Sequence, residues 1–230
     1  MIKVVFATSN KGKAREAAEI LGDTCEIVLP SEFGINEEAE ETGGSFQENA
    51  ELKASFIFEK LHGNGMEGIY AVFADDSGLE VDALGGEPGI YTARYAGEDK
   101  NFSDNMDKLL TKLREAGATE PSERKARFRC AVCLLSSDGQ KLISEGSLEG
   151  HIAPERSGNG GFGYDPVFIP DTAELAGCLS SEDAAQLAGR TLADIPEDVK
   201  NRISHRYKAL HGLKFSSDGQ SRSTASPSDI

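Results

Sequence analysis

Strand-like and helix-like segments alternate along most of this 230-residue chain, and this alternation limits the folds open to it. Ile2–Ala7 is a short apolar run typical of a buried strand, and Lys13–Leu21 carries small apolar residues at helical intervals. Ala126–Ser136 and Lys141–Leu148 flank a Ser-Asp-Gly turn and predict a hairpin. Strands that alternate with helices, followed by a hairpin, favour an α/β fold with a mixed sheet.

The other predicted elements rest on the same two periodicities and on turn residues. Strands are predicted at Glu26–Leu29, Ile69–Ala74 and Val167–Ile169, and helices at Ser45–Leu61, Phe102–Ala116, 181–189, 196–203 and 205–213. The helix at Ser45 begins with a capping box, Ser45-Phe46-Gln47-Glu48. We expect one domain over residues 1–215 and a disordered, Ser-rich tail over 216–230, which has almost no apolar residues to bury.

Charge and hydropathy exclude several classes of protein. Lys and Arg number 24 against 39 Asp and Glu, a net charge of −15, which disfavours general nucleic-acid binding. No run approaches the ~18 apolar residues of a membrane span. The first segment turns polar too early for an export signal, so we expect a cytoplasmic protein without nucleic-acid or membrane partners. A small anionic ligand is still compatible, because local cations, helix N-termini and a metal act at close range.

Cys130 and Cys133 have the C-x-x-C spacing of zinc and redox sites. They lie in a predicted strand, where a spacing of three puts the two side chains on opposite faces. The sequence contains no second cysteine pair at zinc spacing. We therefore expect both cysteines to be buried and reduced.

A first polar cluster joins the first strand to the first helix and comprises Thr8, Ser9, Asn10, Lys11, Gly12 and Lys13. Backbone N–H groups and two lysines at a helix N-terminus favour an anion. The cluster lacks the G-x-x-x-x-G-K-[ST] spacing of a Walker A loop. The alternative is an ordinary N-cap at Ser9 or Asn10 with solvated lysines.

A second cluster, Asp75-Asp76-Ser77-Gly78, follows the strand predicted at Ile69–Ala74. Successive side chains at a strand end point to opposite sides, so one carboxylate can face a cleft while the other packs or caps. Hard carboxylate oxygens suit Mg²⁺, which usually takes one or two carboxylates together with substrate phosphates. The alternative is an Asx-turn that finishes in glycine.

A third cluster is the glycine-rich segment 158–166. It contains G-x-G-x-x-G, but Tyr-Asp-Pro follows, so the helix that a dinucleotide site needs is missing. Phe162, Tyr164 and Asp165 suit a planar base instead, because an aromatic ring can stack on it while a carboxylate reads its edge. The alternative is a tight turn with core aromatic residues.

Two further groups offer functional side chains. Glu40 lies in an acidic loop, where the alternative is a solvated carboxylate. Ser204-His205-Arg206 sets an imidazole beside a guanidinium near a helix start, where the alternative is a cap with exposed charges. Together the clusters supply an anion cradle, a carboxylate metal site and an aromatic base pocket, and a nucleoside triphosphate needs all three.

Five long stretches carry a resemblance to a known family. They are ATSNKGKAREAAEIL (7–21), EEAEETGGSFQENAELKA (37–54), ADDSGLEVDALGGEPGIYTARYAGED (74–99), GNGGFGYDPVFIP (158–170) and KNRISHRYKAL (200–210). In this order they resemble the inosine/xanthosine triphosphate pyrophosphatases, also called Ham1-like, over about residues 2–214.

The resemblance implies Mg²⁺-dependent hydrolysis of non-standard purine triphosphates, such as ITP, dITP and XTP, to the monophosphate and pyrophosphate. It also implies an elongated two-lobed α/β fold with a long mixed sheet and a central active-site cleft, assembled as a homodimer. Asp76 would activate water, and Glu40 and Asp76 would serve the Mg²⁺ site. The implied substrate ligands are Thr8 to Lys13, Lys53 and Ser77, then Phe162, Gly163, Tyr164 and Asp165 around the base, and Lys200, His205 and Arg206 on the nucleotide and its 6-oxo edge.

The chain departs from the family before Lys200, where the family's connection is usually shorter. Two segments, 172–175 and 191–194, each resemble the one that usually precedes this lysine. Lys200 is chosen because it keeps its spacing to His205.

Two other functions stay open. One is a Maf-like pyrophosphatase that prefers pyrimidine triphosphates, against which the segments around Phe162 and His205 argue. The other is a sensor that binds a nucleotide without cleaving it. Asp75, Asp76 and Glu40 argue against a sensor, because a sensor needs neither a base nor metal ligands.

Overall fold

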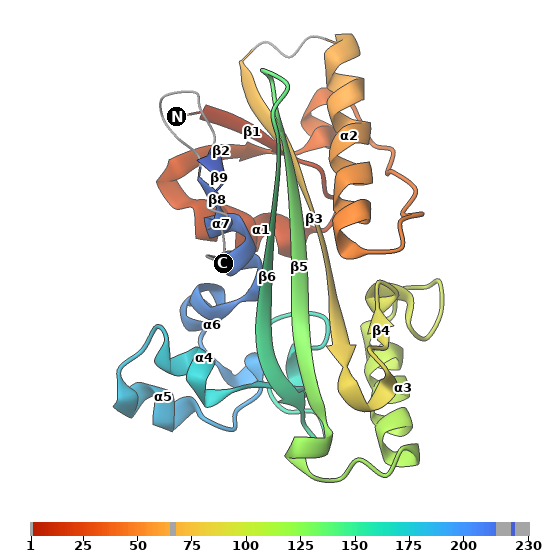
Figure 1. The fold of residues 1–230 in the computed structure, drawn as a ribbon, viewed down its shortest axis with the longest axis vertical. Helices are drawn as coiled ribbons and strands as arrows, with labels where there is room; N and C mark the ends of the chain where they lie inside the picture. The colour runs from red at the N-terminus through yellow and green to blue at the C-terminus, as the bar shows by residue number, and fades with distance from the viewer. Residues whose placement is uncertain (1, 65–67, 215–221, 224–230) are drawn as a thin grey trace, which may run out of the picture. The chain divides into compact units, whose positions relative to one another are not determined.

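The computed structural model describes residues 2–64, 68–214 and 222–223 of the chain (Figure 1). Its strands are β1 (Ile2–Phe6), β2 (Cys25–Val28), β3 (Ile69–Val81), β4 (Pro88–Gly89), β5 (Lys125–Ser136), β6 (Lys141–Ile152), β7 (Phe168–Pro170), β8 (Leu213–Lys214) and β9 (Arg222–Ser223). Its helices are α1 (Lys11–Leu21), α2 (Phe46–Asn64), α3 (Phe102–Glu115), α4 (Thr172–Ala176), α5 (Ser181–Leu187), α6 (Glu197–Ile203) and α7 (His205–Gly212). None of the helices in these ranges combines the length and the apolar character needed to cross a membrane.

Strands β1 to β7 form one sheet within the described residues. Neighbouring strands in this sheet follow the order β2-β1-β3-β5-β6-β7, and β4 pairs with β3 outside this order. β1 is parallel to both β2 and β3, so Val4 lies beside Ile27 and Ala71. β7 is antiparallel to β6, and Phe168 lies beside Ile152. Parallel and antiparallel pairs in one sheet confirm the predicted α/β class with a mixed sheet.

The chain divides into two compact units. Unit 1 consists of Met1–Asp76, Cys130–Gly146 and Arg206–Ile230, and unit 2 consists of Ser77–Arg129 and Ser147–His205. Strands β3, β5 and β6 each contribute residues to both units. Each unit has hydrophobic clusters of its own.

In unit 1 the period-two alternation of β1 sends its side chains into two different apolar clusters. Val4 and Phe6 pack with α1 and α7, and the Phe6 ring stacks on Phe73 with ring centroids 4.3 Å apart. Val5 belongs to the other cluster, with Leu61 of α2. α1 and α7 therefore cover one face of the unit 1 sheet, and α2 covers the other (Figure 1).

Cys130 and Cys133 of β5 show the same alternation. Cys130 belongs to the cluster with α1 and α7, and Cys133 belongs to the cluster with α2. Both thiols are buried and free. The prediction of buried cysteines on opposite faces of a strand is confirmed.

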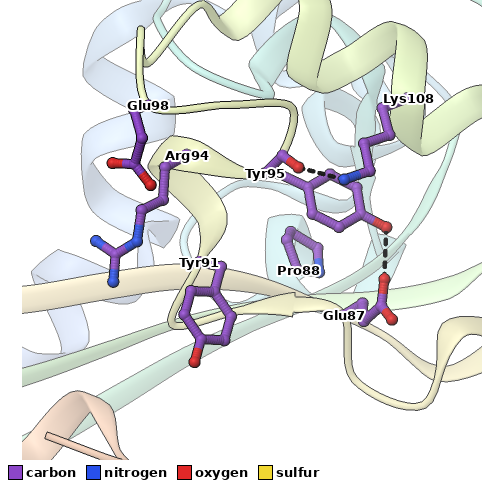
Figure 2. Close-up of a pocket in the computed structure, with 7 residues that line it drawn as sticks. All are labelled: Glu87, Pro88, Tyr91, Arg94, Tyr95, Glu98 and Lys108. Carbon is purple, nitrogen blue, oxygen red and sulfur yellow. Dashed lines mark hydrogen bonds between the residues drawn. The ribbon is translucent and has the colours of Figure 1, made fainter. Parts of the chain in front are cut away.

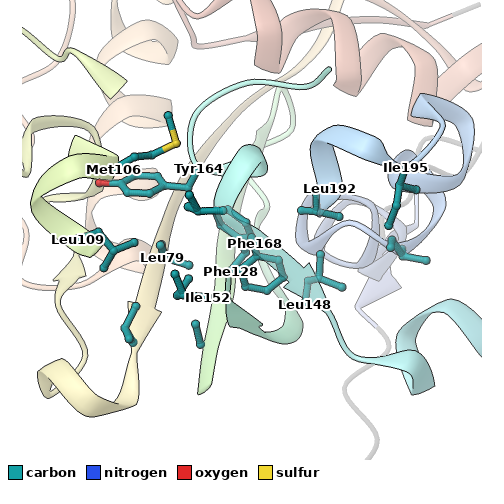
Figure 3. Packing of buried hydrophobic residues seen from close by; sticks show 14 of the residues in the cluster. Leu79, Met106, Leu109, Phe128, Leu148, Ile152, Tyr164, Phe168, Leu192 and Ile195 are labelled. Carbon is teal, nitrogen blue, oxygen red and sulfur yellow. The ribbon is translucent and has the colours of Figure 1, made fainter. Parts of the chain in front are cut away.

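The core of unit 2 gathers α3 and parts of the three long strands. Leu109 of α3 lies in one cluster with Leu79 of β3 and Ile152 of β6 (Figure 3). The Phe128 ring of β5 packs against Phe168 of β7, with ring centroids 4.7 Å apart. The apolar stripe that predicts a helix near residues 102–116 is therefore the face that α3 buries.

β3 is longer than predicted. It ends at Val81, so Asp75 and Asp76 lie within the strand rather than after it. The backbone beyond them keeps hydrogen-bond partners, because β4 pairs with it and the Leu79 N–H donates to Thr92 Oγ1 at 2.8 Å. The Asx-turn alternative is therefore wrong.

The C-terminal residues differ from the predicted disordered tail at one point. Arg222–Ser223 forms β9, which pairs antiparallel with β8. Main-chain groups can form such a ladder without apolar side chains, so the composition of the tail does not report it. The rest of the predicted tail, 216–221 and 224–230, lies outside the described residues.

Candidate active site

The segment between β1 and α1 is built as a helix N-terminus. Asn10 is the N-cap, and its Oδ1 accepts hydrogen bonds from the N–H groups of Gly12 at 2.9 Å and Lys13 at 3.1 Å. Of the six predicted residues, Ser9, Asn10 and Lys11 are exposed, and Thr8, Gly12 and Lys13 are half-buried. The N-cap interpretation is therefore right for Asn10. The exposed polar groups still lie at the positive end of the helix dipole, where an anion is favoured.

Asp75 and Asp76 point to opposite faces of β3. Asp75 faces the side of α1, where the Lys13 Nζ lies 3.1 Å from its Oδ1. Asp76 faces α2, where the Lys53 Nζ lies 2.7 Å from its Oδ1. The period of a strand separates the two carboxylates as predicted, and each therefore has its own lysine.

Asp75 belongs to a buried chain of alternating charges in unit 1. Arg206 donates to the Asp75 Oδ2 from Nε at 3.0 Å and from Nη2 at 2.9 Å, and its guanidinium also contacts Glu16 of α1. Arg206 is only 1% exposed. Burial lowers its pKa, but the carboxylates of Glu16 and Asp75 outweigh this effect and raise the pKa of Arg206. The order Glu16, Arg206, Asp75, Lys13 thus runs from a buried carboxylate to the lysine of the first polar cluster.

The position of Arg206 differs from the role that the resemblance implies. Its side chain lies between Glu16 and Asp75 instead of presenting a guanidinium for a purine edge. A cation here offsets two carboxylates that would otherwise be buried without a partner charge. The sequence shows only that Arg206 follows His205, and this adjacency gives no sign of the burial.

Asp76 is held at both carboxylate oxygens by α2. Lys53 donates to Oδ1 at 2.7 Å, and the Asn49 amide donates to Oδ2 at 3.3 Å. Burial raises the pKa of Asp76 above its ordinary value, and the ammonium groups of Lys53 and Lys13 act against this rise. A fixed carboxylate with a raised pKa has the properties of a general base.

Glu41 is the acidic-loop residue that lies beside the same lysine. The Lys53 Nζ is 2.7 Å from the Glu41 Oε1 and 2.7 Å from the Asp76 Oδ1, so one ammonium bridges the two carboxylates. Glu40, which the resemblance implies as a metal ligand, is exposed. Across the described ranges, no three His, Cys, Asp or Glu side chains gather as a metal cluster. Two carboxylates with phosphate oxygens are nevertheless a usual donor set for Mg²⁺.

In unit 2 the glycine-rich loop is organised around Asp165. The Asp165 Oδ2 accepts the Phe162 backbone N–H at 2.7 Å and the Lys200 ammonium at 2.6 Å. The Lys200 Nζ also lies 4.6 Å from the centre of the Phe162 ring. Gly163 has a φ of 65°, which favours glycine at that turn. The loop and α6 thus bring a ring, an ammonium and a carboxylate together, and this supports the choice of Lys200.

Tyr164 belongs to the core, so the alternative interpretation is right for this residue. Its side chain lies among the other core residues of unit 2 (Figure 3). It is 1% exposed, and its hydroxyl donates to the Thr92 carbonyl at 3.0 Å. The ring meets Phe102 edge-on, with ring centroids 6.0 Å apart. Burial raises the pKa of Tyr164. The implied base-lining role is therefore corrected, because this side chain is enclosed by other core residues.

His205 and Ser77 are the two other predicted residues of unit 2, and both are half-buried. The His205 ring stacks on Phe128, with ring centroids 4.9 Å apart and planes 13° apart. This stack fixes the plane of the imidazole. Phe128 lies outside every stretch that carries the resemblance, so no motif points to it.

A cavity of about 390 Å³ in unit 2 is lined by other residues, namely Glu87, Pro88, Tyr91, Arg94, Tyr95, Glu98 and Lys108 (Figure 2). Several of its polar groups bind one another. The Tyr95 hydroxyl donates to Glu87 at 2.9 Å, and Lys108 donates to the Tyr95 carbonyl. The cavity therefore does not present a convergent set of catalytic groups.

Comparison with known proteins identifies the family. A sequence model of the Ham1 family matches residues 4–215. The chain belongs to the Ham1 family. A relative from Clostridium perfringens, named dITP/XTP pyrophosphatase, is 42% identical over 216 residues, covering 93% of this chain and 96% of the relative. A protein of the same name from Methylococcus capsulatus is 44% identical over 211 residues, covering 90% and 92%.

Solved structures agree with the Ham1 assignment. A HAM1 protein from Coxiella burnetii is 34% identical and superimposes with a TM-score of 0.72, covering 92% of this chain and 95% of that one. The Ham1 fold expected from the sequence motifs is therefore confirmed.

Four residues of this Ham1-family chain join the predicted site residues, although the sequence motifs give none of them a role. Glu16 contacts Arg206, Glu41 contacts Lys53, Asn49 donates to Asp76, and Phe128 stacks on His205. Glu16 and Asn49 lie inside the resembling stretches. Glu16 follows Lys13 by three residues and Asn49 precedes Lys53 by four, a spacing that places each pair on the same face of a helix and could have indicated both residues.

Proposed function

We propose that this chain hydrolyses dITP, ITP and XTP to the nucleoside monophosphate and pyrophosphate. The names of its relatives, dITP/XTP pyrophosphatases, support this reaction. The structural observation that carries the proposal is Asp76, whose two oxygens are held by Lys53 and Asn49. Mg²⁺ dependence, a homodimer and a cytoplasmic location belong to the same proposal and rest on the family resemblance.

Asp76 is the proposed general base. Water attacks the α-phosphorus, the bond from this phosphorus to the bridging oxygen breaks, and pyrophosphate leaves. Asp76 takes a proton from the water, an effect typically worth about 10²–10⁴-fold in rate. The carboxylate must be ionised for this step, and Lys53 and Lys13 favour the ionised form.

The segment from Thr8 to Lys13 is the proposed phosphate site. Its accessible polar groups lie at the N-terminus of α1, where backbone N–H groups and the helix dipole attract an anion. Lys13 is held there by Asp75 at 3.1 Å. Lysine ammonium groups stabilise the negative charge that builds on the phosphate oxygens during the reaction.

The carboxylates of Asp76 and Glu41 are the proposed Mg²⁺ ligands. Both offer the hard oxygens that this cation prefers, and both lie 2.7 Å from the same Lys53 ammonium. Glu41 takes the place of Glu40 in this proposal, because Glu40 is exposed while Glu41 lies beside Lys53 with Asp76. When bound, the metal would neutralise charge on the substrate phosphates.

The group around Phe162 in unit 2 is the proposed site for the purine base. The ring offers a stacking surface, and the Lys200 ammonium beside it is a donor suited to a 6-oxo group. Adenine carries an amino group at that position and would leave buried donors unpaired. The proposed site thus favours a 6-oxopurine over ATP.

Pyrophosphate release with Mg²⁺ tests the proposal on ITP, XTP, GTP, ATP and dTTP at equal concentration. We expect rapid turnover of ITP and XTP only, with inosine monophosphate as the product from ITP. Asp76→Asn should lower kcat by at least about 10²-fold and leave ITP binding largely intact. Asp107→Asn changes an exposed carboxylate of α3 and serves as the matched control. Preference for dTTP would favour the Maf-like reaction, and binding without turnover would favour the sensor.

A further inference from the structure

The turn at residues 191–194 lies directly against the glycine-rich loop of unit 2. The Thr191 Oγ1 donates to the Ser157 carbonyl at 3.0 Å, and the Ser157 hydroxyl donates to the Asp194 carboxylate. Thr191 is buried although its side chain is polar. The two side chains at the ends of the turn therefore hold the same residue at the start of the loop.

The backbones of this turn and the loop meet without room for a side chain. The Ala193 carbonyl accepts the Gly160 N–H at 3.1 Å. A Cβ on Gly160 would lie 2.9 Å from the Ala193 oxygen, and one on Gly158 would lie 2.6 Å from the Ala193 carbonyl carbon. Gly158 also has a φ of +79°, which favours glycine. These two glycines thus allow the close approach of the turn.

The other segment with a similar sequence, 172–175, has a different place. Thr172 is exposed at the start of α4. The Glu174 carboxylate accepts the Glu149 N–H of β6 at 3.2 Å, and Leu175 packs in the core. These contacts attach α4 to β6 and the core, whereas the 191–194 turn is attached to the loop.

We propose that Thr191 and Asp194 are positioning residues that hold the glycine-rich loop in place for the base. The loop continues from residues 157–160 to Phe162 and Asp165, and Asp165 binds Lys200. If the first half of the loop were released, the Phe162 ring and the Asp165 carboxylate would therefore be displaced together. The proposal rests on the proposed function, because it takes this loop to be the site for the purine.

Thr191→Val tests the role of the hydroxyl, because the change removes it and nearly keeps the shape. We expect the KM for ITP to rise about tenfold, since small misplacements of recognition groups have effects of this order or larger. The ratio of kcat/KM for ITP to that for ATP should fall, while kcat for ITP stays within about threefold, because Asp76 is not displaced.

Three further variants make the result specific. Thr191→Ser keeps the hydroxyl, and Thr172→Val makes the same chemical change in the 172–175 segment. The KM for ITP of both variants should therefore stay within about twofold of that of the unmodified protein. Ser157→Ala removes the hydroxyl bond to Asp194 at an exposed position, where loss of folding is not expected. It should shift KM and selectivity in the same direction as Thr191→Val, by a smaller factor.

An unchanged KM for ITP and an unchanged ITP-to-ATP ratio of kcat/KM in Thr191→Val would overturn the proposal. Equal effects of Thr191→Val and Thr172→Val, or a loss confined to kcat, would also overturn it. Hydrogen exchange gives a readout independent of catalysis: amides of residues 158–163 should exchange faster in Thr191→Val and not in Thr172→Val, and equal exchange would count against the role. An unmodified protein inactive on all five nucleotides would refute the proposed function, and the exchange measurement would still decide on the positioning.

Discussion

The Arg206 guanidinium binds one oxygen of Asp75 twice, from Nε at 3.0 Å and from Nη2 at 2.9 Å. The other Asp75 oxygen lies 3.1 Å from the Lys13 Nζ. Asp75 therefore links a buried arginine to a lysine of the proposed phosphate site. Its neighbour Asp76 has a separate set of partners on α2, so the two adjacent carboxylates have different tasks in the proposed reaction.

Arg206→Met should lower the free energy of unfolding by about 3–5 kcal/mol, because it leaves Glu16 and Asp75 buried without their shared cation. Urea unfolding followed by circular dichroism measures the change. Arg202→Met removes a largely exposed arginine from its pair with Asp198 and should cost less than about 1 kcal/mol. Similar losses for the two variants would show that the buried chain of charges adds no particular stability.

Lys53→Met should move the acid limb of the plot of kcat against pH to higher pH, as measured by ITP turnover over a series of pH values. Burial raises the pKa of Asp76, and a protonated Asp76 cannot accept a proton, so kcat falls as pH falls through that raised pKa. Lys53 lowers the pKa of Asp76, and its removal should therefore raise this pKa further. Lys60→Met, on the same helix and paired with Glu37, should leave the limb in place. An acid limb that stays or moves downward in Lys53→Met would refute the coupling.

Glu41→Gln should raise the Mg²⁺ concentration for half-maximal activity by at least about tenfold, because it removes a proposed ligand oxygen charge. Glu40→Gln, one residue earlier and exposed, should change it less than about twofold. Activity titrated with MgCl₂ at saturating ITP measures both variants. A larger increase in the required Mg²⁺ concentration for Glu40→Gln than for Glu41→Gln would instead support Glu40 as the metal ligand.

The buried thiols should react slowly with Ellman's reagent in the native protein at pH 8. Burial raises the pKa of Cys25 to about 11. Burial and, to a smaller extent, the charge of Glu51 raise the pKa of Cys133 to about 12. Little thiolate, the reactive form, is therefore present at either residue. Cys178 is half-buried and should react first. In guanidinium chloride all four cysteines should titrate. Two missing thiols under denaturing, non-reducing conditions would instead show a disulfide, contrary to the free cysteines of the structure.

Features set by neighbouring residues were predictable from the sequence. The Ser45 hydroxyl caps α2 as predicted, because it accepts the Glu48 N–H at 3.2 Å, while the Glu48 carboxylate accepts the N–H of Gly44 at 2.7 Å rather than that of Ser45. The strand period predicted that Cys130 and Cys133 face opposite sides, and that Asp75 and Asp76 diverge. Each of these results depends on a few residues within one element, and their spacing is written directly in the chain.

Other features follow only from the tertiary structure. The length of β3 depends on its pairing with β4, and the place of Tyr164 depends on the core that surrounds it. Arg206 meets Asp75 and Glu16 across 131 and 190 positions of sequence.

The amino-acid sequence by itself therefore determined the α/β class, the caps, the strand alternation and the motifs of the Ham1 family. The tertiary structure decided that Arg206 is buried, that Glu41 and Asp76 share the Lys53 ammonium, and that the 191–194 turn contacts the glycine-rich loop. The physical reason is that helix and strand periods act between near neighbours. A buried charge or a glycine contact depends on which distant segment the fold places against it.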